Sequence, residues 1–200
     1  MHREILLWHL STLLLVLFVG CSTPPDPLSL PAKTDSGNLR VVVEIPAGTN
    51  HLVQYDPVAR TFHAPSEESD LGKLEFLPHP VNVGFIPSTY RSVNDSMPIK
   101  ALLMAESIPT GLAMEARPLA HMVLQNSEGG QSHYLLTIPA ARSRRVISDS
   151  TFTQFRTQHP AAQEILALWA RHHRPSDSIR EIIWTDEREA MAWLEEHLVQ

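Results

Sequence analysis

The sequence LRVVVEIPAGTNHLVQYD, residues 39–56, carries the strongest strand signal in this chain. Residues 41–45 form an aliphatic run that is interrupted by one carboxylate, Glu44, and ended by Pro46. A largely apolar run of this length is typical of a strand that is covered on both faces, so we expect the Glu44 side chain to be buried. The turn residues 48–50 and the short run 51–55 then predict a hairpin.

The remaining sequence alternates between strand and loop signals before it becomes helical. Three prolines within residues 77–87 predict a fixed coil, because proline interrupts regular strands. We expect strands over 60–63, 115–125, 133–139 and 179–184, with an acidic loop at 66–73 and a hairpin turn at 126–130. Apolar residues at helical spacing predict helices over 161–173 and 187–199.

The N-terminal segment has the layout of a signal peptide. Arg3 precedes an apolar run over residues 5–18, and Gly20 stands just before Cys21, the sole cysteine. This junction resembles a bacterial lipobox, so we expect residues 1–20 to be removed and Cys21 to be lipidated. The alternatives are an uncleaved anchor or cleavage elsewhere. A lipidated product would be anchored in the bacterial cell envelope, at the outer membrane facing the periplasm.

Residues 21–38 are rich in proline and polar side chains, which predicts an extended tether between the lipid and a folded domain over 39–200. The 200-residue chain is 43% hydrophobic, which suits one domain of ordinary size. Its formal net charge of -6 argues against a nucleic-acid partner. The histidines do not fall in a metal-ligand spacing such as HxxxH.

Short motifs, taken in order, resemble those of the soluble (family I) inorganic pyrophosphatases. The resemblance starts at about Leu39 and runs to the C terminus. It rests on residues 41–47, on Asn82, Gly84 and Ile86, on Asp95, Ser96, Pro98, Ile99 and Ala101, and on Arg117 and Pro118. The resemblance implies an α+β fold, built on a small closed or partly open OB-like β-barrel with flanking helices. It also implies Mg²⁺-dependent cleavage of pyrophosphate and a tendency to form homo-oligomers.

Many positions that the family uses for chemistry carry other residues in this chain. Met97 and Lys100 replace two aspartates of the motif around Asp95. Gln54 replaces a phosphate-binding lysine, His79 a tyrosine, and the His172–His173 pair a tyrosine and a lysine. The last aspartate and lysine positions fall near Ser132 and Tyr134. The matching carboxylates that remain are Glu44, Asp56 and Asp95, of which Asp95 is the candidate metal ligand.

Lys100 bears most directly on the reaction that the resemblance implies. Exchanging a metal-facing carboxylate for an ammonium changes the local charge by +2. Two unit charges about 4 Å apart interact with roughly 4 kcal/mol at an effective dielectric of about 20. A two-metal centre is therefore disfavoured. Lys100 could instead pair with Glu44, Asp56 or Asp95, or it could point into solvent.

Three hypotheses for the function follow. The first is a pseudoenzyme that binds phosphate, pyrophosphate or an envelope partner without a metal cofactor, with candidate anion-binding residues Lys100, Gln54, His79, Tyr134, His172 and His173. The two histidines could alternatively only cap their helix. The second is a residual Mg²⁺-dependent diphosphatase that uses Glu44, Asp56 and Asp95. The third is a structural envelope lipoprotein with no ligand.

Overall fold

The computed structural model describes residues 25–64, 76–89, 97–174 and 178–199. Cys21, Asp95 and the predicted loop at 66–73 lie outside these residues. The described strands are β1 (Leu39–Ile45), β2 (Gln54–Asp56), β3 (Thr61–His63), β4 (Asn82–Ile86), β5 (Ile99–Leu103), β6 (Ala113–Asn126), β7 (Gln131–Pro139) and β8 (Ile179–Asp186). The described helices are α2 (Phe152–Gln158), α3 (Pro160–His172) and α4 (Glu187–Glu195), with short 3₁₀ helices η1 (Pro27–Ser29) and η2 (Arg142–Arg144).

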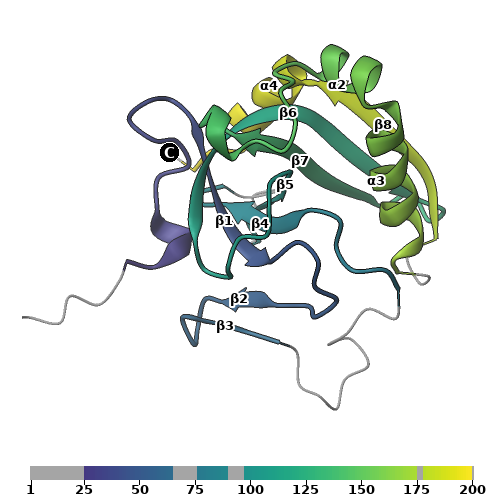
Figure 1. Ribbon diagram of the computed structural model, residues 1–200. Coiled ribbons are helices and arrows are strands. Elements are labelled where there is room, and N and C mark those ends of the chain that lie inside the picture. The colour runs from purple at the N-terminus through teal and green to yellow at the C-terminus, as the bar shows by residue number, and fades with distance from the viewer. Residues whose placement is uncertain (1–24, 65–75, 90–96, 175–177, 200) are drawn as a thin grey trace, which may run out of the picture.

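Six strands form one sheet in the order β1-β4-β5-β7-β6-β8 (Figure 1). A second pairing, between β1 and β6, closes five of these strands into a small barrel, and β8 extends the sheet beyond β6. Neighbouring strands run antiparallel except for β5 and β7, which are parallel. The predicted fold class, an α+β fold with a small β-barrel and flanking helices, is confirmed.

Strand β1 is covered on both faces, as its aliphatic run predicts. Val41 and Val43 belong to the cluster that also contains Leu194 of α4, whereas Val42 packs with Tyr55 and Phe85 on the opposite face. Glu44 is buried as expected, with 3% of its surface exposed. A carboxylate in such a position needs partners, because an isolated buried charge is costly.

The predicted hairpin of residues 39–45 and 51–55 is wrong. Strand β2 pairs with β3, not with β1. Both edges of β1 are already occupied, by β4 on one side and by β6 on the other. The β2–β3 pair therefore lies outside the barrel wall as a separate two-stranded sheet (Figure 1). The strand expected at 60–63 is confirmed as β3.

The predicted coil at 77–87 is also wrong in part, because residues Asn82–Ile86 form the fully buried strand β4 between β1 and β5. The three prolines lie on either side of this strand, so they interrupt no ladder hydrogen bond. Gly84 lets β4 approach β1 closely: a Cβ atom at this position would overlap the carbonyl oxygen of Val42.

Residues 25–38, which the sequence assigns to an extended tether, instead lie against the barrel. The Asp26 carboxylate caps η1 and accepts a hydrogen bond from the Tyr55 hydroxyl at 3.0 Å. Ser88 donates to the Leu28 carbonyl, and Arg40 N donates to the Ala32 carbonyl. These contacts tie the segment to the folded domain over most of its length.

The helices cover the sheet from the C-terminal half of the chain. Pro160 opens α3, and Asp186 caps α4 by accepting from the backbone N–H groups of Arg188 and Glu189. The predicted helices at 161–173 and 187–199 are confirmed, the first shifted by one residue and the second ending four residues earlier, whereas α2 was not predicted. Across the described ranges, we find no helix with the length and hydropathy required to cross a bilayer.

Candidate functional site

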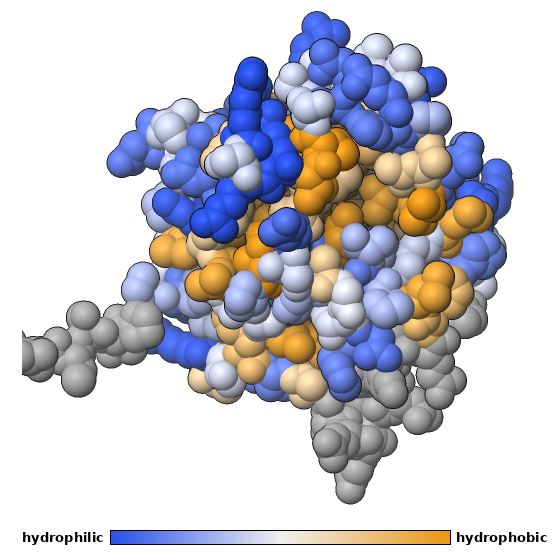
Figure 2. Space-filling view, in the orientation of Figure 1, coloured by the Kyte–Doolittle hydropathy of each residue, from blue (hydrophilic) through white to orange (hydrophobic). Residues whose placement is uncertain are grey.

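A pocket of about 140 Å³ lies on the outer face of the barrel, between α3 and β2. Figure 2 shows hydrophobic side chains around a hollow near the middle of this face. Ten of the sixteen lining residues are apolar, among them Leu52, Val81, Leu102, Met122, Leu166 and Trp169. The polar lining residues are Gln54, His79, Lys100, Tyr134, His173 and Arg174.

Five of the six predicted anion-binding residues meet in this pocket, from five different parts of the chain. Gln54 comes from β2, His79 from the segment before β4, and His173 from the end of α3. Lys100 on β5 and Tyr134 on β7 are direct neighbours in the parallel register. The sixth, His172, is exposed and does not line the pocket.

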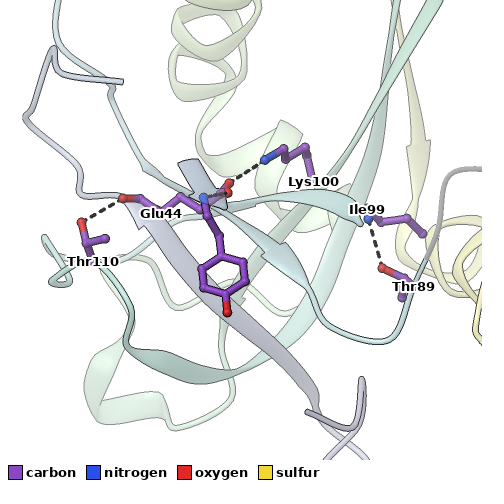
Figure 3. Close-up of polar contacts among 6 residues, drawn as sticks. Glu44, Thr89, Ile99, Lys100 and Thr110 are labelled. Atoms are coloured by element: carbon purple, nitrogen blue, oxygen red, sulfur yellow. Dashed lines mark hydrogen bonds and ion pairs between the residues drawn. The ribbon is translucent and has the colours of Figure 1, made fainter. Parts of the chain in front are cut away.

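Lys100 reaches from β5 to the buried carboxylate of Glu44 on β1 (Figure 3). Its Nζ lies 2.6 Å from Glu44 Oε2, and the backbone N–H of Tyr55 donates to Oε1 at 3.1 Å. Both carboxylate oxygens therefore have a partner. Of the pairings that the sequence left open for Lys100, the one with Glu44 is confirmed.

The Asp56 carboxylate serves the turn that follows β2. Its Oδ1 accepts hydrogen bonds from the backbone N–H groups of Val58 and Ala59 at 2.7 and 3.0 Å. The hydrogen bond from Ala59, followed by that from Val58, lowers the pKa of Asp56. Neither Asp56 nor Glu44 lines the pocket.

The donor set of the described pocket does not fit Mg²⁺. This ion is held in proteins by oxygen ligands, of which one or more are carboxylates. None of the sixteen residues that line the pocket is an aspartate or a glutamate. The carboxylate of Glu44 is paired with the ammonium of the lining residue Lys100. Among the described residues, no group of three or more His, Cys, Asp or Glu side chains is placed to hold a metal.

His79 is the most unusual polar group of the pocket. Only 4% of its surface is exposed, and its ring packs against Trp169 with centroids 4.6 Å apart. Neither ring nitrogen has a hydrogen-bond partner among the described residues. Burial, and then the positive charges of His173 and Arg174, lower the pKa of His79 to about 4. The imidazole is therefore neutral near pH 7.

His173 closes the C-terminal end of α3. Its Nδ1 lies 3.1 Å from the Trp169 carbonyl oxygen and 3.0 Å from that of Ala170, and its ring stacks on Trp169. The predicted capping role is confirmed for this histidine. Trp169 and Arg174 are pocket residues that the sequence reasoning did not select, because they appear there only as part of a helix and of its end.

His79 makes the stability of the fold depend on pH. The unfolded chain takes up this proton below about pH 6.5, whereas the folded chain does so only near pH 4, so stability falls as the pH falls between these values. His79→Leu is expected to raise the free energy of unfolding by about 1–2 kcal/mol at about pH 5, relative to its effect at neutral pH. Urea unfolding at both pH values measures the difference.

The exposed His172 supplies the control. His172→Gln should leave the pH dependence of stability unchanged, because this side chain lies outside the pocket and is in contact with water. An unchanged pH dependence in His79→Leu would contradict the assignment of His79 as a buried, neutral group.

Comparison with known proteins identifies the family of this chain. The model of the family described as "Pyrophosphatase: Inorganic pyrophosphatase" matches residues 41–198. The inorganic pyrophosphatase of Saccharolobus solfataricus is 30% identical over 115 residues, which cover 54% of this chain and 59% of the relative. That of Neisseria meningitidis serogroup B is 29% identical over 110 residues, with 55% and 58% covered. The matched segment thus spans somewhat more than half of these relatives.

Solved structures show the same fold. Type I inorganic pyrophosphatase from P. falciparum superposes with a TM-score of 0.73 at 16% identity, covering 88% of this chain and 62% of that one. The inorganic pyrophosphatase from Coxiella burnetii gives a TM-score of 0.65 at 19% identity, with 86% and 97% covered. Together with the family model, which spans the barrel and the helices of the described domain, these likenesses show that the chain belongs to the inorganic pyrophosphatase family.

Proposed function

We propose that this chain is a pseudoenzyme of its family, which binds a small anion in the pocket beside β2 and α3 without a divalent metal. The observation that carries this proposal is the ion pair between Lys100 and Glu44, with Nζ and Oε2 2.6 Å apart. Pyrophosphate hydrolysis by metal ions needs carboxylates that hold the metals, activate a water molecule and neutralise the leaving phosphate. Here the buried carboxylate neutralises an ammonium instead.

The charge of the pocket supports an anion. Its lining contains Lys100, Arg174 and four neutral or weakly basic polar side chains, but no carboxylate. Glu44 balances Lys100, which leaves the Arg174 guanidinium as the uncompensated charge among the lining residues that the structure describes. Gln54 and Tyr134 add uncharged polar groups to the lining.

The competing function is a residual Mg²⁺-dependent inorganic diphosphatase, which the names of the relatives favour. It would have to use Glu44, Asp56 and Asp95. The structure describes two of these three carboxylates, and both already have partners. Glu44 forms an ion pair with Lys100, and Asp56 accepts hydrogen bonds within its own turn. The geometry of the described residues therefore supports binding better than hydrolysis.

An assay of orthophosphate release from pyrophosphate with millimolar Mg²⁺ separates the two functions. The purified protein is expected to give no release above that of buffer, while phosphate or pyrophosphate raises its melting temperature by ligand linkage. Release that disappears in Glu44→Gln would establish the diphosphatase instead. If neither anion changes the melting temperature, phosphate and pyrophosphate are excluded as ligands of the pocket, and an organic anion, an envelope partner or a structural role without a ligand remains.

We also propose that Cys21 is lipidated and that the protein faces the periplasm from the outer membrane. Because Asp26, five residues after Cys21, already accepts a hydrogen bond from Tyr55 of the barrel domain, the chain between Cys21 and this contact can span at most about 17 Å. The barrel would then lie close to the bilayer surface, contrary to the long tether expected from composition.

Fractionation of a bacterial host that produces the protein tests this anchoring. The unaltered chain is expected in the membrane fraction, and Cys21→Ser in the soluble periplasmic fraction, because the lipid supplies the attachment. A Cys21→Ser chain that stays with the membrane would contradict lipidation as the anchor. Size-exclusion chromatography of the soluble variant would reveal whether a homo-oligomer forms, as the family resemblance implies.

A further inference from the structure

We propose that the pocket accepts an organic carboxylate, with a compact apolar body of about six carbon atoms, in preference to phosphate. This inference rests on the proposed function, since it names the class of anion that the same pocket would bind. It is carried by the apolar walls, the size of the pocket and the single uncompensated charge among the described lining residues.

The apolar walls of the pocket favour a ligand with an apolar body. Ten of the sixteen lining residues are apolar, and a phosphate ion would leave those walls in contact with water. Burying apolar surface stabilises a complex by roughly 25 cal/mol per Å². Trp169 contributes an aromatic ring to the lining, held between the rings of His79 and His173 at centroid distances of 4.6 and 4.0 Å.

The volume limits the size of that body. The pocket measures about 140 Å³, and an engineered apolar cavity of about 150 Å³ is known to hold one benzene molecule. A ring or a short chain of about six carbons therefore fills the apolar part, and a larger hydrocarbon would not fit without movement of α3.

The charge of the pocket fits one carboxylate better than a polyanion. Glu44 already balances Lys100 at 2.6 Å, and no described carboxylate forms a salt bridge with Arg174. One net positive charge thus faces the ligand. Pyrophosphate carries several negative charges near pH 7, which this pocket could not balance without added cations.

The polar end of the pocket offers donors for a carboxylate head. His79 has one N–H group and one bare nitrogen when neutral, and neither has a partner in the described structure. Both His79 nitrogens are covered by surrounding atoms, so a carboxylate would accept from the Arg174 guanidinium, which also lines the pocket.

Calorimetric titration of the purified protein with four probes tests the proposal. The probes are sodium benzoate, sodium hexanoate, inorganic phosphate and benzyl alcohol, the last being an uncharged molecule of similar size. Benzoate and hexanoate are expected to bind at least about tenfold more tightly than phosphate or benzyl alcohol, because only they supply both body and charge.

Variants separate the charge from the apolar walls. Arg174→Gln should weaken benzoate binding by about five- to tenfold and leave benzyl alcohol unaffected, while Arg180→Gln, an exposed arginine that does not line the pocket, should change neither. Ala170→Leu places a larger side chain in the lining and should abolish benzoate binding. Circular dichroism of each variant confirms that it folds.

Each outcome has one reading. Phosphate that binds as tightly as benzoate overturns the organic ligand but leaves the proposed anion binding intact. Benzyl alcohol that binds as tightly as benzoate overturns the carboxylate, as does benzoate affinity that is unchanged in Arg174→Gln. If none of the four probes binds, both this inference and the proposed function are wrong.

Discussion

Lys100→Met is expected to lower the free energy of unfolding by about 3–4 kcal/mol at about pH 7. The substitution leaves the Glu44 carboxylate, which is 3% exposed, without its cation and with the Tyr55 N–H as the one donor from the described residues. The double variant Glu44→Gln/Lys100→Met should recover most of the loss, because a neutral amide replaces the unpaired charge. Urea denaturation of the two variants and the unaltered protein measures both values.

Lys33 provides a matched control for the same substitution. It also forms an ion pair, with Glu195 at 3.0 Å, but the two side chains are 35% and 54% exposed. Lys33→Met should therefore cost less than about 1 kcal/mol, as surface pairs generally do. Equal effects of Lys33→Met and Lys100→Met on the free energy of unfolding would contradict the description of the Lys100–Glu44 pair as a buried ion pair.

Asn82→Ala is expected to cost about 3 kcal/mol. The buried Asn82 side chain accepts from the backbone N–H groups of Ala47 and Ile108 at 3.1 and 2.8 Å. Its amide nitrogen donates to the carbonyl oxygens of Leu103 and Glu106 at 3.2 and 3.0 Å. Removing the side chain takes away the acceptor of the Ala47 and Ile108 N–H groups, which is the main source of the cost.

Asn38 serves as the control for Asn82. Its side chain makes hydrogen bonds with Ser36 and Glu115 that are exposed to water, so Asn38→Ala should cost less than about 1 kcal/mol. Urea denaturation measures both variants. A loss below 1 kcal/mol in Asn82→Ala would show that water replaces the amide, and that this residue does not organise the loops around β4.

The motif residues of this sequence fall into two groups, those that hold the fold together and those that line the pocket. Asn82 and Gly84, which match the family, hold β4 against its neighbours through hydrogen bonds and through the lack of a side chain. Lys100, Gln54 and Tyr134, which depart from the family, all face the pocket. The barrel can thus persist while the chemistry of its outer face changes.

The sequence predicted best where a feature depends on local pattern or on charge. The aliphatic run around Glu44 predicted a strand covered on both faces, and the charge of Lys100 predicted a carboxylate partner. The predicted pairing of β2 with β1 was wrong. Both edges of β1 are occupied by β4 and β6, which lie far away in sequence, so β2 pairs with β3. The prediction of a coil at 77–87 missed strand β4, because prolines that flank a strand cannot be told from prolines within a coil.

The pocket could be predicted only as a set of residues. The family resemblance selected Gln54, His79 and Lys100, although it gave no information on what surrounds them. The apolar walls depend on how α3 packs over the sheet and on the space it leaves uncovered, which no local pattern encodes. Arg174 was missed for a similar reason, since its position after the helix end gives no sign that it faces the pocket.

Calorimetric titration of the unaltered protein with millimolar Mg²⁺, with and without a non-hydrolysable pyrophosphate analogue, tests most directly whether the Lys100–Glu44 pair has taken the place of a metal centre. We predict no saturable Mg²⁺ binding in either titration, because the buried carboxylate is already neutralised by the ammonium at 2.6 Å. Stoichiometric Mg²⁺ binding that is lost in Glu44→Gln would contradict this account.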